Sequence, residues 1–284
     1  MNCQPVVLTV DVEDYFMSPE SIAFEQWSSF EDRVQVGLNR LLDMLSTCGR
    51  TATFFFLGYV AERHPEAVIS VAKAGHEVAV HHYWHQPYEQ IGKARFLEGL
   101  RRTKGILEDL IGTKVIGHRA PMWSVRRDMP WVFEGLLENG FQYDSSLFPI
   151  RTYLYGDAGA EPEPHWLNFG GGRILEVPPS TQTVFGRRIP VGGGFFLRAY
   201  PLGMTRWGIN RRLRSGRSVV LYVHPWELDP GHPRLQLPTK LAWIHAVGLN
   251  RLGRKMTELV KQYEFTSLGN ALSRFEAIAG GTNA

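Results

Sequence analysis

The segment from Val6 to Phe16 reads VVLTVDVEDYF and predicts the organisation of the whole chain. Its first half, Val6–Val10, is a continuous and mostly β-branched apolar run, which is typical of a strand buried on both faces. Asp11, Glu13 and Asp14 follow at once. Carboxylates are costly to bury unless they are solvated, paired or bound to metal. The segment therefore predicts either a strand-to-loop turn with solvated acids or an active site at a strand's carboxyl end.

The rest of the chain alternates buried strands with amphipathic helices. Apolar runs predict strands at 51–57, 77–80, 115–117, 141–146, 218–223 and 265–267, and helical periodicity predicts helices at 30–46, 65–74, 91–110, 131–138, 201–215 and 252–263. This alternation predicts an α/β fold with a parallel sheet, best arranged as a barrel of β/α units. We expect one domain over residues 1–284, with a core at about 6–268 and a loop-rich insertion at 149–200.

Bulk composition excludes several classes of protein. The chain has 284 residues and a formal charge of +3, which is too small a bias to indicate nucleic-acid binding. Cys3 and Cys48 provide no disulfide framework. The start shows no signal-peptide pattern, and no apolar run approaches the roughly 20 residues needed to span a bilayer. A cytoplasmic protein is expected.

Two histidines follow the predicted strand at 77–80. His81 and His85 have the i, i+4 spacing that presents two imidazoles to one side, and two nitrogen ligands suit a divalent metal. A pair with this spacing is, on its own, more often structural. Polar residues also occur at the carboxyl ends of three other predicted strands: Arg119, Asp144 and His224.

Together these strand ends provide the groups for metal-assisted hydrolysis of an amide or ester. Two histidines and one carboxylate can hold a metal and leave positions open. A second carboxylate can act as general base, and a histidine can protonate the leaving group. Arg119 can pair with the base carboxylate and keep it ionised.

In combination, these motifs resemble the polysaccharide deacetylases, also called carbohydrate esterase family 4 or the NodB-homology group. The segment Thr9–Phe16 is most similar to the exopolysaccharide-locus branch that is associated with exosortase systems. The resemblance extends from Leu8 to about Phe265. It implies a distorted (β/α) barrel with seven strands.

The resemblance also implies roles for the first two motifs. Asp11 is expected to be the general base, and His81 and His85 metal ligands. The family has two adjacent acids, but here Val12 separates Asp11 from Glu13, so that either Glu13 or Asp14 is the third ligand. His82 replaces the usual Ser or Thr, and either supports the loop through a ring nitrogen or is incidental.

The remaining motifs complete the expected site. Arg119 is expected to orient the base, the N–H of Met122 to bind an oxyanion, and His224 to be the general acid. An Asp often pairs with that histidine in the family, and Asp144 and Glu176 are the candidates here. The expected substrate-binding residues are Met122, Trp123, Asp144 and Trp226, although the two indoles could equally pack the wall.

The implied function is removal of N-acetyl groups from amino sugars of a bacterial polysaccharide or its precursor. The implied cofactor is a divalent metal, Zn²⁺ first and Co²⁺ or Ni²⁺ next. The expected partner is an N-acetylated glycan or lipid-linked saccharide, the latter reached at the inner face of the membrane. Two alternatives are a cyclic amidohydrolase of the allantoinase kind, with or without metal, and a non-catalytic glycan-binding or assembly protein.

Overall fold

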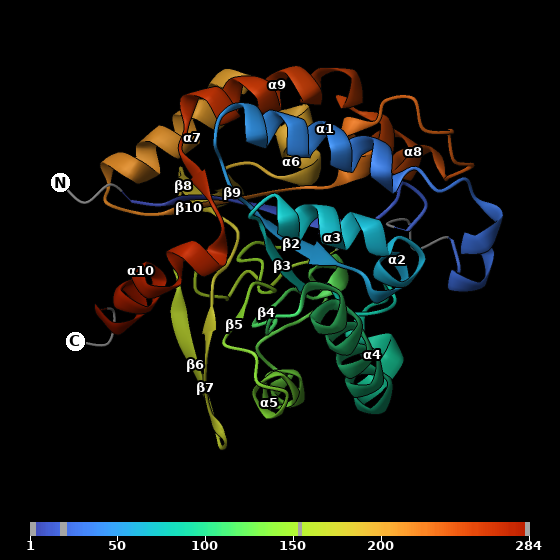
Figure 1. The fold of residues 1–284 in the computed structure, drawn as a ribbon. Coiled ribbons are helices and arrows are strands. Elements are labelled where there is room, and N and C mark those ends of the chain that lie inside the picture. Colours follow the sequence, from blue (N-terminus) through green and yellow to red (C-terminus); the bar gives the residue numbers. More distant parts are fainter. Residues whose placement is uncertain (1–3, 18–21, 153–154, 282–284) are drawn as a thin grey trace.

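The computed structural model describes residues 4–17, 22–152 and 155–281 (Figure 1). Cys3 therefore lies outside the described residues, and Cys48 is a half-buried free thiol. None of the helices in these ranges has the length and apolar content to cross a membrane.

Within the described residues, the main sheet has nine strands, ordered β10-β1-β2-β3-β4-β5-β7-β6 with β11 beside β1. Seven of them, from β10 to β7, form a continuous parallel run, and β6 is antiparallel to β7. The strands are β1 (Val6–Val12), β2 (Thr53–Phe56), β3 (Glu77–Val80), β4 (Gly117–His118), β5 (Tyr143–Asp144), β6 (His165–Phe169), β7 (Gly172–Glu176), β10 (Val219–Val223) and β11 (Phe265–Thr266).

This sheet curls into a half-barrel, which confirms the predicted α/β barrel class. The predicted strand number of seven matches the parallel run, and β6 and β11 are additional. Strand pairing among the described residues leaves β10 and β6 at opposite ends of the path. Two hydrogen bonds tie the segment after β7 to β10: Ser180 N–H donates to the Val220 carbonyl, and Val220 N–H donates to Ser180 Oγ.

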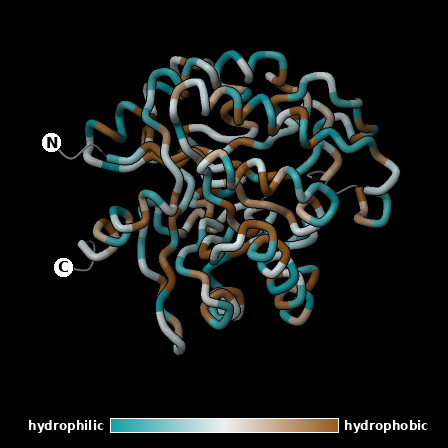
Figure 2. The backbone as a smooth tube through the Cα atoms, viewed as in Figure 1, coloured by the Kyte–Doolittle hydropathy of each residue, from teal (hydrophilic) through white to brown (hydrophobic). Residues whose placement is uncertain are grey.

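Helices cover the outer face of the half-barrel (Figure 1). Hydrophobic residues follow the central strands, whereas hydrophilic and hydrophobic turns alternate along the helices (Figure 2). A small second sheet contains β8 (Thr181–Val184) and β9 (Arg187–Pro190). The helices are α1 (Val34–Thr47), α2 (Gly58–Arg63), α3 (Pro65–Lys73), α4 (Tyr88–Ile111), α5 (Pro130–Glu138), α6 (Gly194–Ala199), α7 (Leu202–Arg214), α8 (Thr239–Ala246), α9 (Leu249–Gln262) and α10 (Leu268–Gly281), with 3₁₀ turns η1 (Phe24–Ser29), η2 (Pro121–Trp123) and η3 (Pro225–Leu228).

Alternation along β1 determines which side chains reach the inside of the half-barrel. Leu8, Val10 and Val12 pack in the large cluster with the outer helices, whereas Val7 belongs to a smaller cluster that α10 covers. Because successive side chains of a strand point to opposite faces, Asp11 points to the same side as Val7. The apolar part of β1 thus fixes the direction in which its acidic end faces.

Candidate active site

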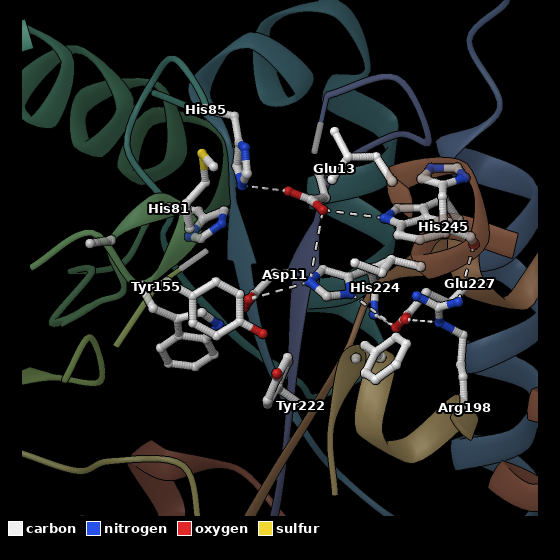
Figure 3. A pocket seen from close by; sticks show the side chains of 18 of the residues that line it. Asp11, Glu13, His81, His85, Tyr155, Arg198, Tyr222, His224, Glu227 and His245 are labelled. Atoms are coloured by element: carbon white, nitrogen blue, oxygen red, sulfur yellow. Dashed lines mark hydrogen bonds and ion pairs between the residues drawn. The ribbon is translucent and has the colours of Figure 1, made fainter. Parts of the chain in front are cut away.

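The site lies at the carboxyl ends of β1, β3, β4 and β10, where sequence-distant polar residues meet (Figure 3). Val10 is paired with Val223, so that Asp11 and His224 are the next residues of two adjacent parallel strands. Val80 is paired with His118, and Arg119 therefore follows beside His81. One cavity is lined by Asp11, Glu13, His81, His85 and His224 together.

Glu13, His81 and His85 form a buried cluster whose ligand atoms all lie within 4.8 Å of one another. Glu13 Oε2 lies 2.8 Å from His85 Nε2. His81 Nδ1–H donates to the Arg119 carbonyl at 2.9 Å, which leaves its Nε2 as the ligand atom. Two imidazoles and a carboxylate in this arrangement fit a divalent metal ion.

The electrostatics of this cluster suit a metal as well. Burial lowers the pKa of His81 to about 4, so that its imidazole is neutral at physiological pH. Burial opposes the charge of Glu13, but His85 and His224 outweigh it and hold the pKa of that carboxyl well below its usual range. A metal requires both forms, neutral imidazole and ionised carboxylate.

The structure separates Asp14 from this cluster, which corrects its candidacy as a metal ligand. Its Oδ2 accepts hydrogen bonds from the N–H groups of Arg33 at 2.5 Å and Val34 at 2.7 Å, and its Oδ1 accepts from Tyr15 N–H. Asp14 thus satisfies free donors at the start of α1. The chain turns after Glu13, which directs the two neighbouring acids to different places.

We expect Asp14→Ala to lower the free energy of unfolding by about 1–2 kcal/mol, as for the loss of a helix cap. Denaturant unfolding measures this change. Asp14→Asn retains an acceptor oxygen and is expected to cost less. A loss of stoichiometric metal in Asp14→Ala, with unfolding unchanged, would contradict this capping role.

His82 supports the loop that carries His81 and His85, as one of the two sequence interpretations expected. It adopts a left-handed backbone conformation (φ 64°), and its ring nitrogens lie 3.3 Å from the Trp84 carbonyl and 3.1 Å from the Phe96 carbonyl. A Cβ atom on Gly99 would lie 2.6 Å from His82 Nε2, so that only glycine lets α4 approach this closely.

Asp11 is held by a fully buried arginine. Arg119 Nη1 donates to Asp11 Oδ1 and to Thr9 Oγ1, both at 2.7 Å, and its other nitrogens donate to Ser145. The guanidinium carbon also lies 4.7 Å from the Trp123 ring centroid. Because Arg119 Nη1 donates to Asp11 Oδ1, the other carboxylate oxygen, Oδ2, can face the cavity.

His224 faces Asp11 and Glu13 across the cavity. Its Nε2 lies 3.9 Å from Asp11 Oδ2 and 3.8 Å from Glu13 Oε1. Its Nδ1–H donates to Glu227 Oε2 at 2.9 Å, and Arg198 Nε donates to Glu227 Oε1 at 2.5 Å. The three side chains form a continuous chain from the cavity to α6 (Figure 3).

This chain of contacts sets the protonation of the histidine. Burial alone would lower the pKa of His224, but the charges of Glu227, Glu13 and Asp11 raise it to about 9. Burial opposes the charge on Glu227, yet His224 and Arg198 lower the pKa of that carboxyl to about 2. His224 is therefore a proton donor at neutral pH.

The carboxylate that pairs with His224 is Glu227. Neither Asp144 nor Glu176, the two candidates from the sequence, makes this contact. Asp144 does not line the cavity, which also corrects its assignment to substrate binding. Its Oδ1 accepts from His118 Nδ1–H at 2.7 Å and from Ser146 Oγ–H at 2.6 Å. Glu176 Oε1 accepts from the Leu147 N–H. Asp144 thereby links the end of β4 to the segment after β5, outside the cavity.

Met122, Trp123 and Trp226 do line the cavity. The indole N–H of Trp226 donates to Glu13 Oε1 at 3.2 Å, and its ring stacks on His245 at 4.3 Å. Trp226 therefore orients the carboxylate as well as forming a wall. Met122 and Trp123 have left-handed backbones (φ 57° and 50°), a strained conformation that is concentrated at functional sites.

The glycine triplet Gly192–Gly194 provides space beside His224. Gly193 (φ 140°) and Gly194 (φ 47°) have backbone conformations that side chains rarely adopt. A Cβ atom on Gly193 would lie 2.2 Å from the Tyr222 ring, and one on Gly194 would lie 3.3 Å from His224 Cε1. The chain bends tightly at these glycines, and the bend brings α6 and Arg198 to the site.

Sequence reasoning missed Glu227 and Arg198. One local signal was available for Glu227, because an acid three residues after His224, beyond Pro225, fits a capping box. Arg198 provides no such signal, since its contact with Glu227 depends on how α6 packs.

Two family models match this chain. Residues 24–136 match the polysaccharide deacetylase model, which includes His81, His85 and Arg119. Residues 145–273 match a model described as a domain of unknown function (DUF3473), which includes His224 and Glu227. The second match agrees with the predicted resemblance to the exopolysaccharide-locus branch.

Three similar proteins illustrate the relationship. A peptidoglycan deacetylase-like protein of Gibberella zeae is 30% identical over 43% of this chain and 36% of its own length. The peptidoglycan deacetylase of Helicobacter pylori is 32% identical over 40% of this chain and 38% of its own length. The chain thus spans less than two fifths of these relatives.

The third is a solved structure of a candidate polysaccharide deacetylase from Mycobacterium smegmatis. It has a TM-score of 0.66 at 23% identity, and the match covers 96% of this chain and 90% of the other. The fold and site therefore define an α/β half-barrel with two histidines and a carboxylate at its carboxyl edge. Residues 24–136 of the chain are thus similar to the polysaccharide deacetylase family, and the fold is that of the Mycobacterium smegmatis structure.

Proposed function

We propose that this chain is a divalent-metal-dependent deacetylase of N-acetylated amino sugars. The observation that carries the proposal is the cavity in which a buried Glu13–His81–His85 cluster faces both Asp11 and His224. A metal site alone would suit many proteins. A candidate base and a candidate acid beside the same cluster, with His224 Nε2 3.9 Å from Asp11 Oδ2, suit metal-assisted hydrolysis of an acyl bond.

Each residue has a distinct role in the proposed reaction. Asp11 takes the proton from the attacking water, and Arg119 keeps its carboxylate ionised and aimed. His224 donates a proton from Nε2 to the departing amine, and Glu227 holds the opposite nitrogen. The Met122 N–H binds the developing oxyanion. Acetate and a free amino sugar are the products.

Glu13, His81 and His85 would hold the metal. When bound, a divalent ion lowers the pKa of a coordinated water and polarises the acetamide carbonyl. Zinc is our first choice, because two nitrogens and one oxygen suit it, and cobalt and nickel accept similar donor sets. A cytoplasmic location remains a prediction from the sequence.

Product analysis tests the proposal. Zinc-reconstituted protein is expected to release acetate and free amine in equal amounts from N-acetylated oligosaccharides. Asp11→Asn supplies the matched inactive sample. Ring opening of a cyclic amide such as allantoin without acetate release would favour the amidohydrolase alternative. Saccharide binding without acetate release from any substrate would favour a binding protein.

The pH profile tests the role of Glu227. A histidine with a raised pKa donates its proton below that pKa and loses this ability above it. The rate is therefore expected to fall as the pH rises through about 9, the pKa of His224. In Glu227→Gln the negative charge is absent, so that the pKa of His224 falls and the alkaline limb moves to lower pH.

We expect Glu227→Gln to reduce kcat/KM at neutral pH less than His224→Ala does, for which a loss of about 100-fold or more is expected. The control Glu258→Gln removes a half-exposed carboxylate that pairs with Arg206 outside the cavity. An alkaline limb that stays in place in Glu227→Gln would show that Glu227 does not tune His224.

A further inference from the structure

The wall of the cavity opposite the metal cluster is apolar. Phe195 from α6 lines it together with Leu237, Leu241 and Ile244. All four are half-buried, and Trp243, at 59% exposure, extends this surface outward through a ring contact with Phe195 at 5.6 Å. We call these five residues the α8 face.

The α8 face is not part of the core. Within the described residues, Phe195, Leu237, Leu241 and Ile244 pack against none of the hydrophobic clusters. The helix α8 has the sequence TKLAWIHA, yet His245 is its buried residue, and the apolar side chains around it remain accessible. An apolar helix that buries its histidine, leaves its leucine half-buried and exposes its tryptophan indicates a binding surface.

The opposite side of the catalytic centre is polar. A second cavity meets the first at Met122, Trp123 and Tyr155, which line both. Carboxylate, amide, hydroxyl and guanidinium groups line this second cavity, and such groups hydrogen-bond sugar hydroxyls. They belong to Glu89, Gln90, Ser124, Arg126, Arg151, Thr152 and Asp157.

We propose that the substrate is amphiphilic: an N-acetylated saccharide whose apolar chain lies on the α8 face. This rests on the proposed function and specifies its substrate class. Continuity identifies the occupant, because the α8 face lines the same cavity as Asp11, Glu13 and His224. A molecule that presents its acetamide to those residues contacts Leu241 and Ile244 on one side and can reach the polar cavity on the other.

Binding to an inactive variant tests the proposal separately from catalysis. Methyl, butyl and octyl glycosides of N-acetylglucosamine, each below its critical micelle concentration, are titrated into zinc-loaded Asp11→Asn by calorimetry. Affinity is expected to rise with chain length, by up to about fourfold for each methylene that is fully buried. Leu241→Asn and Trp243→Ser, each in the Asp11→Asn background, should flatten this dependence. Trp243→Ser should do so without weakening the methyl glycoside, because Trp243 does not line the cavity itself.

Trp207→Ser in the same background is the matched control, because Trp207 is also exposed, at 39%, but lies on α7 outside the cavity. It should leave the chain-length dependence intact. Equal affinity for the whole series, or no binding of any member, would overturn the proposal. If chain length had no effect, two other results would assign the α8 face a different role and overturn the proposal. One is a dimer of the protein that Trp243→Ser dissociates, and the other is adsorption of the protein to plain phosphatidylcholine vesicles. If affinity depends on chain length but the wild type releases no acetate, this inference stands and the proposed deacetylase function is contradicted.

Discussion

Asp11→Asn is expected to reduce kcat/KM for deacetylation by about 100- to 10,000-fold, the usual contribution of a positioned general base. The asparagine keeps an oxygen that can accept from Arg119 Nη1, now 2.7 Å from Asp11 Oδ1, but it cannot take a proton from water. Acetate release at saturating zinc measures the effect. The metal content of the variant is expected to equal that of the wild type, because Asp11 is not in the metal cluster.

A matched control separates lost chemistry from lost stability. Asp11 and Arg119 are both buried, so that weakening their pair also costs stability. Asp32→Asn removes a carboxylate from a partly exposed pair with Arg63 and should retain full activity. A folded Asp11→Asn protein with wild-type kcat/KM would contradict the assignment of Asp11 as the base.

Replacing His81 or His85 with alanine is expected to weaken zinc binding by more than the 10- to 100-fold that is typical of losing an outer partner of a ligand. Each imidazole is one of three protein ligands in the cluster. Elemental analysis after dialysis should show near-stoichiometric zinc in the wild type and little in either variant. Acetate release should fall with the bound zinc.

Thermal unfolding provides a second measure of the same site. Zinc at 100 times its Kd should stabilise the wild type by about 2.7 kcal/mol, because it binds only the folded state. This stabilisation should be absent in His81→Ala and retained in His64→Ala, whose histidine pairs with Asp32 elsewhere. Equal zinc stabilisation of wild type and His81→Ala would place the metal at another site.

The parts of this fold that repeat a simple pattern could be predicted from the sequence. The apolar run of β1 placed Asp11 and Glu13 at the carboxyl edge of the sheet. Both were expected on one face, because side chains two residues apart in a strand point to the same face. The predicted strand at 77–80 coincides with β3, Glu77–Val80. Long helices such as α4 were also predicted, since many turns repeat one pattern.

Features that depend on tertiary packing could not be predicted in this way. The six-residue helices α2 and α6 are too short for a periodic pattern. Asp14 caps α1, which begins twenty residues later, so its separation from Glu13 follows from how that helix docks. Asp144 resembled a site residue because it ends a strand, but β5 directs it to His118 instead.

The central claim is that one metal ion at Glu13, His81 and His85 enables Asp11 and His224 to remove an acetyl group. The most direct measurement is acetate release from an N-acetylated oligosaccharide while zinc is added stepwise to the metal-free protein. We predict that the rate rises linearly and reaches its plateau at one equivalent of zinc, and that Asp11→Asn stays near the baseline. Acetate release that is independent of zinc, or no release at any zinc concentration, would contradict it.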